Sequence, residues 1–333
     1  FTADPQRYSP YSPSSREYLN PLFADPSLLA DQPVSQDGPA LIDWPRAAAA
    51  KLERLRAAYQ ALDGERAAAF ADFAEAADSR LLDHARFEAL HAHFFARDRA
   101  RGWQDWPVAF RDARGEAVAR FAAEQADAVR FHLFLQWIAD ASLRRAAQAT
   151  GGMAIGLIAD IAVGLDAGGS HAWSRGDELM LGIGIGAPPD AFQAAGQNWG
   201  ITSFSPFALK QQGYAPFLSL VRSAMRHAGG IRVDHALGLR RLWVVPNGAS
   251  PLDGAYLRMS EADLLRLIAL ESRRAEAIVI GEDLGVVPPG LREALAERGV
   301  LGMRVLPFER DKAGFVPPAK WPARAVAMTS THD

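Results

Sequence analysis

Residues 277–283, Ala-Ile-Val-Ile-Gly-Glu-Asp, carry the clearest sign of the fold class. An apolar run rich in isoleucine leads through a glycine directly into the carboxylates Glu282 and Asp283. Continuous apolar runs of this kind are typical of parallel strands that are covered on both faces. In an α/β barrel the chemistry lies at the C-terminal ends of such strands. The segment therefore predicts a buried parallel strand that ends in a functional carboxylate.

Similar short apolar runs recur after residue 150 and alternate with amphipathic segments. The runs lie at 154–161, 231–233, 303–306 and 325–328. Helices are expected at 206–227, 260–273 and 289–298. This alternation is typical of parallel strands joined by crossover helices, so the sequence predicts an α/β fold for this part of the chain.

Polar side chains stand at the ends of these predicted strands. They are Asp160 at the first, Arg232, Asp234 and His235 at the second, Glu282 and Asp283 after 277–280, and His332 and Asp333 after the last. One acidic residue in such a place is often only a helix cap or a loop residue. The same feature at four strand ends indicates that the side chains converge on one pocket. Successive strand residues face opposite sides, so only one of Glu282 and Asp283 is expected to face that pocket.

The first half of the chain has a different pattern. Residues 1–40 are rich in Pro, Ser, Asp and Tyr and predict an ordered loop segment. Residues 41–148 are dominated by Ala, Arg, Glu and Leu and predict a helical subdomain. Asp43 is expected to cap its first helix, and further helices are expected at 65–77, 83–97 and 114–148. Residues 149–333 are expected to contain the strands and helices of one barrel, with the predicted pocket.

Length and composition limit the class of protein. A chain of 333 residues, 49% hydrophobic and 23% charged, suits a single soluble barrel. The formal charge of −3 favours neither nucleic acid nor a membrane surface as a partner. The sequence has no cysteine, which excludes disulfides and suits the cytoplasm. No apolar run of about 18 residues predicts a membrane span. The oligomeric state is left open.

The ends of the sequence lead us to expect an internal piece of a longer protein. Residues 1–5 lack the basic and apolar segments of a signal peptide, and the first residue is not Met. At the other end, a predicted strand runs straight into the last residue.

No cofactor and no metal are implied by the motifs. A Walker loop, a dinucleotide fingerprint and a serine-nucleophile elbow are all missing from the sequence. The histidines away from the strand ends lack the spacing of metal ligands. Gly182, Gly184 and Gly186 alternate in what is expected to be a loop that opens no helix, so it does not favour phosphate binding.

Several segments, taken in order, resemble the amylomaltases, a family of 4-alpha-glucanotransferases in the alpha-amylase superfamily. Residues 230–239, Gly-Ile-Arg-Val-Asp-His-Ala-Leu-Gly-Leu, resemble the nucleophile motif, and 281–288, Gly-Glu-Asp-Leu-Gly-Val-Val-Pro, resemble the acid/base motif. Further segments that resemble the family lie at 9–21, 160–164, 186–200 and 329–333. The resemblance runs from about residue 9 to the end of the chain.

The resemblance implies a (β/α)8 TIM-type barrel with an inserted helical subdomain. In that alignment the first two barrel strands lie before residue 1 and the eighth after residue 333, so the barrel is expected to be incomplete and open here. Residues 186–200 correspond to the acceptor-side loop. Family members often carry an aromatic residue where this chain has Ala191.

The resemblance also implies a retaining mechanism with three carboxylates. Asp234 is the expected nucleophile, kept ionised by Arg232 two residues earlier on the same face. Glu282 is the expected general acid and then base, with a raised pKa, and Asp283 is left as a cap or supporting group. Asp333 is expected to hold the hydroxyls of the donor sugar. The alternative for Arg232 and Asp234 is a purely structural ion pair.

Other residues are expected to contact the glucan. By resemblance they are Tyr11, Asp160, Asp190, Phe192, Gln197, Trp199, Arg232, His235 and His332. Tyr11 would stack on the apolar face of a sugar ring. The alternative for each of two of them is a structural role: Asp160 could support its strand, and Phe192 could hold its loop in place, without contact to the glucan.

The expected reaction is transfer of alpha-1,4-glucan segments between maltooligosaccharides. The acceptor loop would exclude water from the glycosyl-enzyme and bind the acceptor sugar. Two alternatives stay open: an alpha-glucan hydrolase that uses the same carboxylates, and a glucan-binding barrel without turnover. A third concerns this piece alone, which lacks strands and could fail to fold into an active barrel.

Overall fold

The computed structural model describes residues 1–29, 41–190, 193–312 and 314–330. The chain divides into two compact units. The first contains 1–149 together with 165–181, and the second contains 150–164 and the chain from 182 onward. No helix in the described ranges has the length and apolar character needed to cross a membrane.

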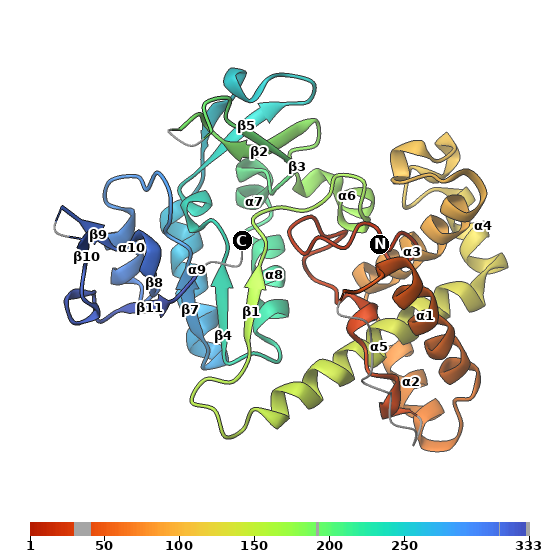
Figure 1. Cartoon of the computed structure of the whole chain (residues 1–333). Helices are drawn as coiled ribbons and strands as arrows, with labels where there is room; N and C mark the ends of the chain where they lie inside the picture. Colours follow the sequence, from red (N-terminus) through yellow and green to blue (C-terminus); the bar gives the residue numbers. More distant parts are fainter. Residues whose placement is uncertain (30–40, 191–192, 313, 331–333) are drawn as a thin grey trace. The chain divides into compact units, whose positions relative to one another are not determined.

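The first unit is helical, as predicted for 41–148. Its helices are α1 (Trp44–Gln60), α2 (Gly64–Glu75), α3 (Ser79–Asp98), α4 (Glu116–Glu124), α5 (Ala126–Ala149) and α6 (Ser170–Ser174) (Figure 1). Short 3-10 turns lie at Pro21–Phe23, Pro26–Leu28, Trp103–Asp105, Val108–Phe110 and Gly176–Glu178. The single helix expected at 114–148 is two helices, because Gln125 leaves the helical conformation between them.

Local sequence explains where these helices begin and pack. The Asp43 side chain accepts a hydrogen bond from the Arg46 N–H, which confirms the predicted cap of α1. Helices α3 and α5 pack against each other, and Phe87 and Phe134 on them are fully buried. Burial of one such aromatic side chain stabilises the fold by about 2–3 kcal/mol.

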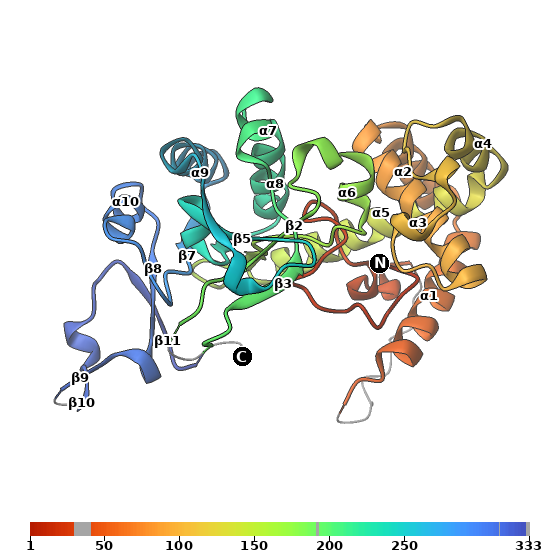
Figure 2. The same ribbon diagram turned by 90° about the horizontal axis from the view of Figure 1, so that it is seen from above.

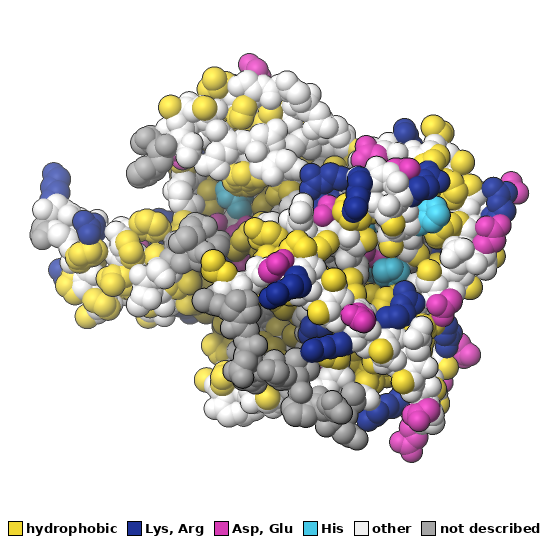
Figure 3. Space-filling view, turned by 45° about the vertical axis from the view of Figure 1, so that its right-hand side comes forward, with side chains coloured by type: hydrophobic (Ala, Val, Ile, Leu, Met, Phe, Trp, Pro, Cys, Tyr) yellow, Lys and Arg dark blue, Asp and Glu magenta, His cyan; other side chains and the backbone are white. Residues whose placement is uncertain are grey.

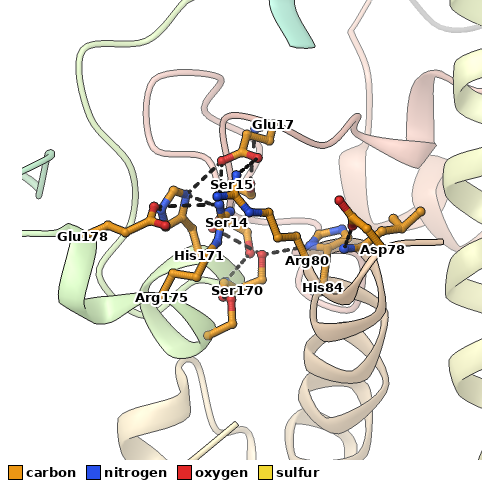
Figure 4. Close-up of polar contacts among 12 residues, drawn as sticks. Ser14, Ser15, Glu17, Asp78, Arg80, His84, Ser170, His171, Arg175 and Glu178 are labelled. Atoms are coloured by element: carbon orange, nitrogen blue, oxygen red, sulfur yellow. Dashed lines mark hydrogen bonds and ion pairs between the residues drawn. The ribbon is translucent and has the colours of Figure 1, made fainter. Parts of the chain in front are cut away.

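A buried polar network holds the segment around Ser14 and Glu17 in the first unit (Figure 4). Arg175 donates a hydrogen bond of 2.8 Å to Glu17. The Ser170 N–H donates one to Ser14 Oγ, and Ser170 Oγ lies 2.8 Å from Nδ1 of His84. The network therefore joins this irregular segment to α3 and to the region of α6.

The second unit contains the predicted parallel strands. Strands β1 (Ile158–Ile161), β4 (Gly230–Val233) and β7 (Ile278–Gly281) form a parallel sheet in that order (Figure 1). A parallel bridge from Ile280 to Leu301 follows, and β8 (Gly302–Val305) pairs in parallel with β11 (Ala325–Met328). The strand predictions are confirmed, except that the first strand begins at Ile158 and not at Ala154.

Helices cover the parallel strands on one side. They are α8 (Ala215–Met225), α9 (Glu261–Ala275) and α10 (Leu291–Glu297), which Figure 2 shows in a row beside the strands, and α7 (Pro206–Gln211) packs against α8. The predicted helix 206–227 is interrupted at Gly213 and Tyr214, which have φ of 57° and 62°. A helix cannot continue through this left-handed backbone.

A four-stranded antiparallel sheet was not predicted. Its order is β3-β2-β5-β6, with β2 (Ile183–Ala187), β3 (Gln197–Ile201), β5 (Arg241–Pro246) and β6 (Ala255–Arg258). The expectation of a loop for Gly184 and Gly186 is wrong, because both lie in β2. A Cβ at Gly186 would meet the Gln197 carbonyl oxygen at 1.8 Å, so glycine is required where β3 approaches.

The remaining elements of the second unit are short. Strands β9 (Arg310–Asp311) and β10 (Gly314–Phe315) form a small antiparallel pair. Short 3-10 turns lie at Ala236–Leu239, Pro251–Asp253, Leu306–Phe308 and Pro318–Lys320.

Candidate active site

The hydrogen-bond ladder of the parallel sheet places the predicted carboxylates at one edge. The Asp234 N–H donates to the Ile161 carbonyl, and the Glu282 N–H donates to the Val233 carbonyl, each at 3.0 Å. Asp234 and Glu282 are each the first residue after a strand, β4 and β7. Because the strands are neighbours and parallel, both residues lie at the C-terminal edge of the same sheet.

Arg232 joins two of the predicted acidic residues. Its Nη1 lies 2.8 and 2.7 Å from the two carboxylate oxygens of Asp160, and its Nη2 lies 2.9 Å from Oδ1 of Asp234. The side chain of Arg232 is 13% exposed and that of Asp234 is 17% exposed, so solvent screens this contact only partly. A guanidinium in this place favours the ionised form of Asp234.

Glu282 is half-buried and lies in a strongly polar setting. Its Oε2 accepts a 2.9 Å hydrogen bond from the His235 N–H, and its Oε1 accepts one of 2.9 Å from the Leu284 N–H. Burial raises the pKa of Glu282, and the charge of Asp234 raises it further. The two N–H donors and Arg232 oppose this rise, and the net direction of the pKa shift is upward. A raised pKa is what a general acid at neutral pH requires.

His235 turns the chain immediately after the end of β4. Its φ is 47°, in the left-handed region that few residues other than glycine adopt. Burial lowers the pKa of its imidazole to about 4, so the ring is neutral at pH 7. The ring meets Trp199 of β3 edge-on at 5.3 Å between centroids, and Trp199 Nε1 donates to Gln197 Oε1 at 2.8 Å. Strand β3 therefore brings two predicted acceptor-side residues to the turn beside Asp234.

Asp283 has the supporting role that was left to it. Its side chain is 2% exposed and accepts hydrogen bonds from Arg292 Nε at 2.7 Å and from the Met303 N–H at 2.8 Å. Since these contacts tie the end of β7 to α10 and β8, Asp283 fixes the backbone from which Glu282 projects.

Other predicted site residues are not brought to this cluster by the described contacts. Asp190 is exposed, and its carboxylate accepts a hydrogen bond from the Gln193 N–H. Tyr11 is half-buried in the first unit, where its N–H donates to Ser9 Oγ. Phe192, His332 and Asp333 lie outside the described residues, as does Ala191.

Sequence reasoning missed the part that Leu284 plays. Its contribution is a backbone N–H, which carries no side-chain signature. The following Gly285 has φ of 78°, so a glycine just after a strand-end carboxylate was the available sign of a turn here.

The sequence model of a family described as "4-alpha-glucanotransferase" matches residues 2–333. The chain belongs to the 4-alpha-glucanotransferase family. Among its relatives, the 4-alpha-glucanotransferase of Mycobacterium tuberculosis is 39% identical over 350 residues, which cover 98% of this chain and 48% of the relative. The chain thus spans about half the length of this relative and of the 4-alpha-glucanotransferase of Haemophilus influenzae.

Solved structures of the family have the same fold. The crystal structure of amylomaltase from Corynebacterium glutamicum superposes with a TM-score of 0.81 at 32% identity, covering 98% of this chain and 47% of that one. Amylomaltase from Streptococcus agalactiae in complex with acarbose gives a TM-score of 0.86 over 98% of this chain and 69% of that one. Its 20% identity means that this second likeness shows the fold alone. The fold is thus the mixed α/β fold of amylomaltases.

Proposed function

We propose that this chain carries the catalytic centre of a 4-alpha-glucanotransferase that acts on alpha-1,4-glucans. The observation that supports it most directly is the pair of carboxyl groups at the ends of β4 and β7. One of them, Asp234, is held by a guanidinium, and the other, Glu282, has a raised pKa. Environments that push two carboxyl groups toward opposite protonation states are typical of a nucleophile and a general acid.

The proposed reaction is a double displacement. The Asp234 carboxylate attacks the anomeric carbon, the bond from that carbon to the leaving oxygen breaks, and Glu282 gives its proton to that oxygen. The 4-hydroxyl of an acceptor sugar then loses its proton to Glu282 and attacks the same carbon, which releases Asp234. Two inversions retain the anomeric configuration.

The further parts of the proposal rest on the family resemblance. The parallel strands β1, β4, β7, β8 and β11 would belong to a (β/α)8 barrel that is incomplete here, with the helices of 41–148 as an insertion. Asp333 would be the third carboxylate, with His332 beside it, and Tyr11, Asp160 and Asp190 would contact the glucan. A cytoplasmic location is predicted from the cysteine-free sequence.

The acceptor side is proposed to include β3 and the segment before it. Trp199, Gln197 and Phe192 would bind the acceptor sugar there. The edge contact of Trp199 with His235 supports this assignment, because it joins β3 to the residue that follows Asp234. An aromatic side chain beside the nucleophile can both stack on a sugar ring and exclude water.

The test is incubation of the complete protein with maltotriose, with products followed by chromatography. Transfer predicts glucose together with a ladder of longer maltooligosaccharides. Glucose and maltose without longer chains would mean a hydrolase, and the acceptor-side proposal would be wrong. A folded protein that releases no product would instead be a glucan-binding barrel.

A further inference from the structure

A pocket of about 320 Å³ lies in the first unit, and none of its lining residues is among those assigned to catalysis. Its walls come from the 3-10 turn Pro26–Leu28 with Leu29, from α2, and from α5. Pockets that bind small molecules begin at about 300 Å³, so it has room for one small ligand.

The charged side chains that line the pocket are all basic. Arg66, Arg144 and Arg145 are its only charged lining residues among those described. None of the three makes an ion pair with a carboxylate in the described part of the chain. Elsewhere arginines share carboxylates, as Arg222 and Arg274 share Glu271. On the face drawn in Figure 3, basic and acidic side chains are interspersed.

One arginine is already oriented. Arg66 Nη1 donates a hydrogen bond of 2.6 Å to the Leu29 carbonyl at the pocket wall. A guanidinium has five N–H donors, so this contact fixes the side chain and leaves further donors for a ligand. Arg144 and Arg145 are exposed on the last turns of α5.

Part of the lining is apolar. Its residues, called the floor from here on, are Leu28, Leu29, Trp137 and Ile138. The Trp137 ring packs against the rings of Phe70 and Phe134 at 5.7 and 5.9 Å, so the core of the unit holds it in place. A flat ring or an alkyl group of a ligand would be desolvated on such a floor.

We propose that this pocket binds a nucleoside phosphate. Planar guanidinium groups bind phosphate oxygens through two parallel hydrogen bonds, and three unpaired guanidinium groups suit a doubly charged phosphate. The floor suits the flat base. A neutral sugar would not need the arginines, and inorganic phosphate alone would leave the floor unused. This site is additional to the proposed glucanotransferase centre and does not depend on it.

Calorimetric titration of the complete protein with adenosine monophosphate tests the proposal, with adenosine and inorganic phosphate as separate probes. We expect the nucleotide to bind with a Kd below about 1 mM, and each separate probe to bind at least about tenfold more weakly. The double variant Arg144→Gln/Arg145→Gln should weaken nucleotide binding by at least about tenfold. The matched control Arg120→Gln removes an exposed arginine of α4 and should leave the Kd unchanged.

Three results would overturn the proposal. The first is a folded protein that shows no heat of binding at about 1 mM nucleotide. The second is nucleotide binding that survives in the double variant. The third is inorganic phosphate that binds as tightly as the nucleotide, since it would mean that the base makes no contact. Because the readout is binding, these results are independent of whether the protein transfers glucans.

Discussion

The backbone N–H of His235 donates a 2.9 Å hydrogen bond to Oε2 of Glu282. His235 directly follows the proposed nucleophile Asp234, and Glu282 is the proposed acid and base. The turn after β4, at a residue with φ of 47°, therefore holds a carboxyl group at the end of β7. Backbone strain of this kind costs about 1–3 kcal/mol and is common at functional sites.

A carboxylate that accepts two N–H groups is favoured in its ionised form, so removing one donor should raise the Glu282 pKa. Leu284→Pro removes the N–H that donates to Oε1. Because Glu282 must be protonated when it acts as an acid, the basic limb of kcat/KM should move to higher pH in this variant. Leu284→Ala keeps the N–H, so the basic limb of its kcat/KM profile should lie at the same pH as in the parent protein. An unchanged limb in a folded Leu284→Pro protein would contradict the assigned role of this hydrogen bond.

Glu282→Gln should reduce turnover of maltotriose at least about 100-fold, because glutamine cannot give a proton to the leaving oxygen. With maltosyl fluoride, whose leaving group needs no proton, the rate of the first release of fluoride, one ion for each active site, should fall much less. Glu297→Gln, an exposed position on α10, is the matched control and should retain the parent rates. An equal loss of rate with maltotriose and with maltosyl fluoride would mean that Glu282 is not the acid.

Asp160→Asn should separate a role in positioning Arg232 from a direct contact with the glucan. If Asp160 positions Arg232 on Asp234, kcat should fall about 10- to 100-fold with little change in KM. Asp253→Asn, an exposed change outside the parallel sheet, should alter neither constant. A raised KM with an unchanged kcat would make Asp160 a substrate contact only.

The buried histidines of the first unit should make the protein less stable in acid. Burial lowers the pKa values of His84 and His132 to about 4. Between pH 6.5 and 4 the unfolded chain binds more protons than the folded chain, so stability is lost as pH falls through this range. From pH 7 to pH 5 the loss should be about 2 kcal/mol for each such histidine.

Urea unfolding at pH 7 and pH 5 measures this effect. His84→Gln should reduce the difference in unfolding free energy between the two pH values, and the exposed His93→Gln should not. Equal stability of the parent at both pH values would show that these histidines are not kept neutral by the fold.

The parallel strands were predictable because their pattern is local. Residues 277–281 form a continuous apolar run, the run 230–233 is interrupted only by Arg232, and a carboxylate follows each run at once. The pairing of Arg232 with Asp234 was also predictable, since residues two apart on a strand face the same side. The alternation of neighbouring side chains predicted that only one of Glu282 and Asp283 would face the pocket, the family resemblance favoured Glu282, and Asp283 is the buried one.

The antiparallel sheet was not predictable in the same way. Glycine has low strand propensity, so the Gly-Ile-Gly-Ile-Gly pattern of 182–186 indicates a loop. Only the approach of Asn198 and Gln197, distant along the chain, explains why Gly184 and Gly186 must lack a side chain. The hydrogen bonds to Glu282 were not predictable either, because both donors are backbone N–H groups, which no side chain in the sequence reveals.

Trapping of the glycosyl-enzyme tests the central claim most directly. The Glu282→Gln variant of the complete protein would be incubated with maltosyl fluoride, digested and analysed by peptide mass spectrometry. The account predicts a maltosyl group bound covalently to the peptide that contains Asp234, and no such label in the Asp234→Asn/Glu282→Gln double variant. A label on a different carboxylate, or fluoride release without any labelled peptide, would contradict it.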